Sequence, residues 1–80
     1  MLKEIVLYST AGCSLCDQML NELIGAPSLA GWQLKVVDIA MDDDLVEEYG
    51  ADLPVLRADG TTLRSPFTLA DVEALLESEH

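Results

Sequence analysis

The two cysteines of this chain, Cys13 and Cys16, stand three residues apart between a strand-like run and a helical pattern. The run covers residues 4–8, and a short turn leads from it to Cys13. A thiol that opens a helix meets unpaired backbone N–H groups and the positive end of the helix dipole. Both favour the reactive thiolate, and a second cysteine one turn later can resolve a mixed disulfide. The pattern therefore predicts redox or metal chemistry.

A structural role for the pair is the weaker interpretation, because a bridge between such close residues closes a very small loop and adds little loop-closure stability. The apolar run near the N-terminus is also too short for a secretory signal or a membrane span. We therefore expect a cytoplasmic, reducing compartment, where a CxxC pair is used for redox chemistry or metal binding.

The net charge of the chain limits the kinds of molecule that it could bind. The chain of 80 residues carries 15 acidic and four basic residues, a net charge of −11, and half of its residues are hydrophobic. This balance argues against nucleic acid and anionic membranes, and mainly favours solubility, although it would also suit a basic partner protein. The length predicts one domain over residues 1–80 with its own core.

Periodicity predicts the first three elements. After the strand at residues 4–8, a helix over residues 14–24 has five residues at helical spacing, Cys16, Met19, Leu20, Leu23 and Ile24, and ends at Gly25-Ala26-Pro27. A β-branched run over residues 33–39 predicts a second strand. The connection is long enough for a crossover, so the two strands should pair in parallel.

The second half predicts a short helix, a hairpin and a closing helix. Asp42-Asp43-Asp44 would cap a helix that ends near Gly50, and Asp59-Gly60 joins strand runs at residues 53–57 and 61–64. Thr68 and Asp71 form a near capping box for the last helix. The order β-α-β-α-β-β-α predicts an α/β three-layer sandwich with a four-stranded mixed sheet and helices on both faces.

Individual residues carry functional and structural interpretations side by side. Cys13 is the candidate nucleophile and Cys16 the more buried resolving thiol. The helix start should lower the pKa of Cys13, but only modestly, because Asp17 places a like charge one turn later. Asp38 could carry a proton, although a solvated or capping carboxylate is the simpler interpretation, and Tyr8 fits the core better than catalysis.

The chain resembles the glutaredoxin-like members of the thioredoxin-fold superfamily, and in particular small bacterial glutaredoxin-like domains. The resemblance covers essentially the whole chain through its main motifs, Val6-Leu7-Tyr8-Ser9, Cys13-Ser14-Leu15-Cys16, Val37-Asp38-Ile39, Tyr49-Gly50, Leu53-Pro54-Val55-Leu56 and Asp59-Gly60. It implies that Pro54, an ordinary trans proline by composition alone, is the superfamily's cis-proline. It also implies that the Leu53 backbone, with Gly12, Ser14 and Leu15 around Cys13, contacts the substrate.

The departures from the family pattern concern glutathione. Ser14-Leu15 replaces the usual Pro-Tyr between the cysteines, Thr10-Ala11-Gly12 lacks the usual lysine, and Ser65-Pro66-Phe67-Thr68 replaces a Gly-Gly turn with an aspartate. Two usual anchors for the glutathione carboxylates are therefore missing, and we expect weak glutathione binding. Thioredoxins proper carry a Trp-Cys-Gly-Pro-Cys signature and a longer N-terminal extension. Neither matches this sequence, so the resemblance is to the glutaredoxin-like group.

The resulting hypothesis is a cytoplasmic, monomeric thiol–disulfide oxidoreductase that needs no bound cofactor. Its substrate would be a protein or small-molecule disulfide, and its reductant either glutathione or a thioredoxin reductase. A second hypothesis is a metal or iron–sulfur module through the CxxC thiolates, which would have to pool ligands from two chains because one chain offers only two. A third is a non-catalytic adaptor that docks a partner through the acidic surface.

Overall fold

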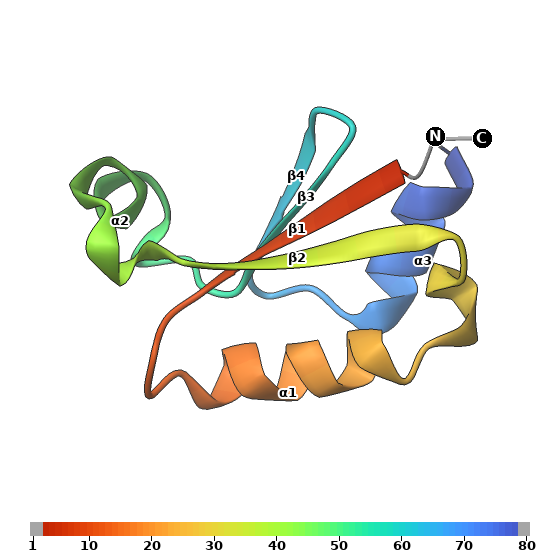
Figure 1. Cartoon of the computed structure of the whole chain (residues 1–80), viewed down its shortest axis with the longest axis horizontal. Helices are drawn as coiled ribbons and strands as arrows, with labels where there is room; N and C mark the ends of the chain where they lie inside the picture. Colours follow the sequence, from red (N-terminus) through yellow and green to blue (C-terminus); the bar gives the residue numbers. More distant parts are fainter. Residues whose placement is uncertain (1–2, 79–80) are drawn as a thin grey trace.

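The computed structural model describes residues 3–78, which form four strands, three α-helices and two short 3₁₀ turns (Figure 1). The elements follow in the order β1 (Lys3–Ser9), α1 (Ser14–Ile24), η1 (Pro27–Leu29), β2 (Trp32–Asp38), η2 (Ile39–Met41), α2 (Asp43–Tyr49), β3 (Val55–Ala58), β4 (Thr61–Arg64) and α3 (Leu69–Ser78). Among the described residues no helix is long and apolar enough to cross a membrane.

The four strands form one mixed sheet in the order β2-β1-β3-β4. β1 pairs in parallel with β2, so that Leu7 lies opposite Val36, and antiparallel with β3, so that Leu7 also lies opposite Leu56. β3 and β4 pair antiparallel. The parallel pairing of β1 and β2 confirms the crossover predicted from the length of their connection.

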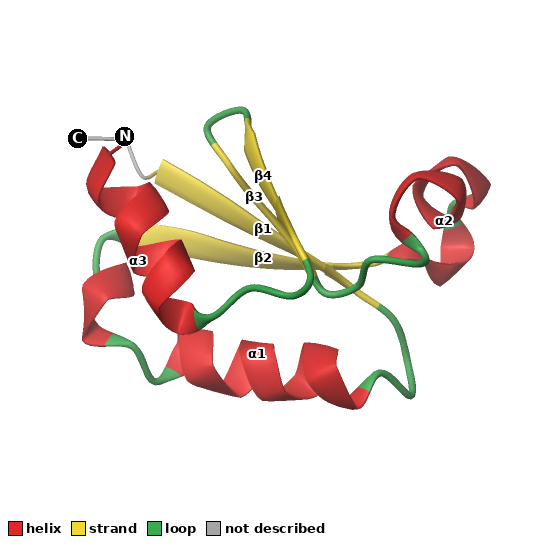
Figure 2. Ribbon diagram, turned by 180° about the vertical axis from the view of Figure 1, so that it is seen from behind, coloured by secondary structure: helices red, strands yellow, loops and turns green. Residues whose placement is uncertain are grey.

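The main core lies between the sheet and the helices α1 and α3, which cover the same face (Figure 2). Because side chains alternate along a strand, Ile5 and Leu7 of β1 share this face with Leu56 and Ala58 of β3. Packed with these four are the other buried members of the cluster, Met19, Leu23, Leu29, Val72 and Leu76.

The opposite face of the sheet is covered at one end only. Tyr8 and Val55 pair across β1 and β3 and therefore share this face, and the ring of Tyr49 at the end of α2 stacks on Tyr8 with 4.8 Å between centroids. Lys35 and Arg57, farther along this face, are exposed. The predicted three-layer arrangement is confirmed, with α2 as a short outer layer at the end of the sheet where β1 stops.

Local chemistry sets the ends of the elements as expected. The Asp42 carboxylate accepts hydrogen bonds from the N–H groups of Asp44 and Leu45 at 3.0 and 3.2 Å, which satisfies two donors at the start of α2. Thr68 and Asp71 exchange hydrogen bonds as a capping box before α3. Asp59 and Gly60 both have positive φ, 47° and 82°, as a tight hairpin turn requires.

Several predicted details were wrong. Ile24 shares the helical spacing of the apolar residues in the first helix, but it is 69% exposed at the last position of α1. The second strand begins one residue earlier and ends at Asp38, and Ile39 is buried in a 3₁₀ turn instead. The third strand begins at Val55 rather than at residue 53, since Pro54 has no N–H for the ladder.

Candidate active site

The turn between β1 and α1 carries the two cysteines. Gly12 has φ of +80°, a left-handed conformation that glycine adopts without steric cost, and it turns the chain from the strand into the helix. Cys13 follows as the N-cap of α1 with extended backbone angles, and Cys16 lies one turn along. A disulfide joins the two cysteines, whose Cα atoms are 5.2 Å apart.

The two sulfurs differ in exposure. Cys16 is 1% exposed and sits against the core, whereas Cys13 is half-buried at the surface. Ser14 and Leu15 between them are exposed, Leu15 to 58%. Cys13 is therefore the more accessible of the two cysteines.

Backbone groups at the helix start act on the Cys13 sulfur. The Cys16 N–H donates to Sγ of Cys13 at 3.2 Å, and the Asp17 N–H donates to the Cys13 carbonyl at 3.1 Å. When the bridge is reduced, the first of these bonds and the helix dipole favour negative charge on the Cys13 sulfur. The Asp17 carboxylate is exposed, so solvent screens its opposing effect.

The Leu53–Pro54 peptide bond is cis, as the family resemblance implies for Pro54. Pro54 is buried and Leu53 half-buried just before β3. The structure contains a second cis bond, Ser65–Pro66, which sequence reasoning did not predict.

A groove of about 240 Å³ brings these segments together. We call it the Glu22 groove; its walls include Leu15, Gln18 and Glu22 of α1, Pro54 before β3, and Pro66 and Phe67 of the segment before α3. Leu15 and Pro54 were predicted to meet the substrate, whereas the remaining residues were missed. Residues 15, 18 and 22 share one side of a helix, so helical spacing from Leu15 could have found the α1 wall.

An arginine network holds the segment that leads into Leu53. The Arg64 guanidinium pairs with the carboxylates of Asp52 at 2.7 Å and Glu48 at 2.6 Å, and it also donates to the Glu48 carbonyl. It lies 5.0 Å from the centroid of the Tyr49 ring, which itself stacks on Tyr8. Hydrogen bonds to Asp52 and then Glu48 raise the pKa of Arg64 above its usual value, and the guanidinium is positively charged at neutral pH.

Two residues whose roles the sequence left open, Asp38 and Tyr8, now have structural ones. Asp38 caps η2 by accepting from the Ala40 N–H at 2.9 Å, which agrees with the simpler interpretation of a capping carboxylate. Tyr8 is half-buried and stacks on Tyr49 on the face opposite the main core, so it packs against another ring but lies outside the core cluster predicted for it. Trp32 is partly buried against the core.

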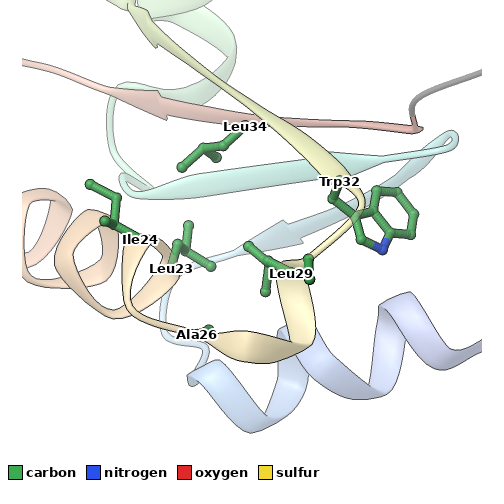
Figure 3. A pocket seen from close by; sticks show the side chains of 7 residues that line it. Leu23, Ile24, Ala26, Leu29, Trp32 and Leu34 are labelled. Carbon is green, nitrogen blue, oxygen red and sulfur yellow. The ribbon is translucent and has the colours of Figure 1, made fainter.

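A second hollow, of about 310 Å³, lies at the other end of α1 (Figure 3). Leu23, Ile24, Leu29, Trp32 and Leu34 line it. Its lining is apolar, and α1 separates it from the cysteines by about 15 Å at 1.5 Å per residue. Within residues 3–78, no three histidine, cysteine or acidic side chains gather in a group that could hold a metal ion.

A mixed sheet with a CxxC pair at the end of its central β1 strand and a cis-proline before β3 defines a thioredoxin-fold protein with a redox-type disulfide. The chain belongs to the family described as Glutaredoxin-like domain (DUF836), whose model matches residues 4–78. None of the curated proteins matches the sequence significantly.

Solved structures agree with this assignment. The X. campestris structural genomics target XcR50 is 32% identical, with a TM-score of 0.78 over 92% of this chain and 96% of that one. Protein Ne2328 from Nitrosomonas europaea is 27% identical, with a TM-score of 0.75 over 95% and 92%. Thioredoxin 1 from Thermosipho africanus is 15% identical, with a TM-score of 0.72 over 95% and 92%, and supports the fold alone.

Proposed function

We propose that the protein is a thiol–disulfide oxidoreductase that works through Cys13 and Cys16. The observation that carries the proposal is the asymmetric pair: a half-buried Cys13 at the start of α1, bonded to a Cys16 that is 1% exposed. A structural bridge would be expected to protect both sulfurs, whereas an exchange reaction needs one of them at the surface.

In the reduced protein, the Cys13 thiolate attacks one sulfur of the substrate disulfide. A Cys13–substrate disulfide forms, and the other half of the substrate leaves as a thiolate. The Cys16 thiolate then attacks Sγ of Cys13, closes the bridge and releases the second substrate thiolate. The substrate gains two electrons and becomes two thiols, the Cys13–Cys16 pair loses them, and a dithiol reductase or two glutathione molecules must return them.

The backbone before β3 would position the substrate. Leu53 directly precedes Pro54, which lines the Glu22 groove, and an extended substrate chain could pair with the Leu53 backbone as an added strand. Gly12, Ser14 and Leu15 would contact the substrate around the attacked bond. The protein is proposed to act without a bound cofactor, as a cytoplasmic monomer.

Trapping experiments test these roles. Cys16→Ser should hold a substrate peptide as a stable mixed disulfide through Cys13, because the resolving thiol is gone. Cys13→Ser is the matched control and should hold none, since its remaining thiol is buried. Equal trapping by both variants would contradict the assignment of roles. Parallel assays with glutathione and with a thioredoxin reductase would identify the reductant.

A further inference from the structure

The Glu22 groove begins at Leu15, two residues after the proposed nucleophile, and has a distinctive chemical lining. Its walls are largely apolar, from Leu15, Pro54, Pro66 and Phe67. Its polar groups at α1 are the amide of Gln18 and the exposed carboxylate of Glu22. None of the described residues that line the groove is basic.

The other charges near the groove do not favour an anion either. The start of α3, where an anion would ordinarily find free N–H groups, is occupied by the protein's own carboxylate: the Thr68 N–H donates to Asp71 at 2.8 Å. Arg64 directly precedes Ser65, which also lines the groove, but its guanidinium is held by Glu48 and Asp52. A negatively charged ligand would therefore meet carboxylates with no cation to balance them.

A lysine or arginine side chain fits this lining better. Such a side chain can lay its apolar stem along Leu15, Pro66 and Phe67 and present its charge to the carboxylate of Glu22. The helix places Glu22 about 14 Å from Cys13, at 1.5 Å per residue. That distance is about four residues of extended chain, or fewer where a long side chain spans part of it.

We propose that the Glu22 groove selects protein disulfides that carry a lysine or arginine about two to four residues from the attacked cysteine. This inference rests on the proposed oxidoreductase function and names its substrate class. The same groove discriminates against glutathione mixed disulfides, because the tripeptide brings carboxylates where the protein already has them. The ion pair with Glu22 forms in the encounter with substrate, so it acts on kcat/KM.

The test compares two peptide disulfides that differ only in lysine or glutamate at the third residue from the cysteine. The wild-type protein should reduce the lysine peptide with a kcat/KM about two- to fivefold higher, as expected for one exposed ion pair. Glu22→Lys should invert this preference and should speed the reduction of a glutathione mixed disulfide. Glu77→Lys makes the same charge change at the far end of α3 and should leave the preference unchanged.

The possible results separate the selection by charge from the oxidoreductase function. Equal rates for the two peptides in the wild-type protein, or a preference that survives Glu22→Lys, would overturn the selection by charge and leave the oxidoreductase intact. A protein that reduces neither peptide would refute the oxidoreductase. Selection could then still be measured without turnover, as the difference in binding of the same two peptides with serine in place of cysteine; equal binding would refute it.

Discussion

Reduction followed by alkylation tests the asymmetry of the two sulfurs. If the bridge is opened with a reductant and the protein is treated briefly with iodoacetamide, Cys13 should react first, because it lies at the surface at the start of α1. Cys16 is 1% exposed and lies within α1, so it can react only when the helix opens.

The expected ratio follows from the free energy of that opening. A chain of this length has a total stability of about 4–12 kcal/mol. If exposing Cys16 requires only about 3 kcal/mol of it, the reactive population falls about 100-fold, since each 1.4 kcal/mol is a factor of ten. Cys16 should therefore be alkylated about two orders of magnitude more slowly than Cys13.

Mass spectrometry of peptides from timed samples would give both rates. The control is the same experiment in a denaturing concentration of urea, where the protection of Cys16 should disappear. Similar rates for the two thiols in the folded protein would refute the reasoning, because Cys16 could then serve as the nucleophile equally well.

Three further predictions concern stability and positioning. Leu56→Ala removes a residue that is 0% exposed and should lower the free energy of unfolding by about 2.7–5 kcal/mol, which lowers Tm by roughly 15–30 °C in calorimetry. Val36→Ala is the control, at a residue that is 45% exposed, and should lower Tm far less. Similar losses of Tm in the two variants would contradict the packing. Arg64→Gln should raise KM for a disulfide peptide while leaving the alkylation rate of Cys13 unchanged, because Arg64 holds the segment before the cis-proline. Arg57→Gln is the charge-matched control. An equal rise in KM in both variants would exclude a role of Arg64 in positioning that segment. Thr68→Ala removes a cap of α3 and should cost about 1 kcal/mol, or several degrees in Tm, which serine at the same position should restore.

Local patterns in the sequence were enough to predict most of the fold. The helix at residues 14–24 has the predicted bounds, because both its end signals and its spacing are local. The Asp59-Gly60 turn and the capping residues of α2 and α3 were found for the same reason. The parallel pairing of β1 and β2 followed from a general rule on crossovers.

The site was only partly predictable. Cys13, Cys16 and Pro54 are marked by motif or resemblance, but the Glu22 groove is not. Phe67 lines this groove together with residues of α1 that precede it by more than forty positions. Residues so far apart in the sequence meet only when the sheet has formed. Arg64 likewise pairs with Glu48 and Asp52 across 16 and 12 positions, and no sequence period relates them.

The strand that carries the cysteines runs through the interior of the sheet, with β2 on one side and β3 on the other. If an edge strand, β2 or β4, separates from the sheet, β1 still keeps a neighbouring strand on at least one side, and the turn that carries Cys13 keeps its attachment to β1. Substitutions in β2 and β4 should consequently disturb the position of Cys13 less than substitutions in β1. The cysteines therefore follow a strand that is hydrogen-bonded on both of its edges.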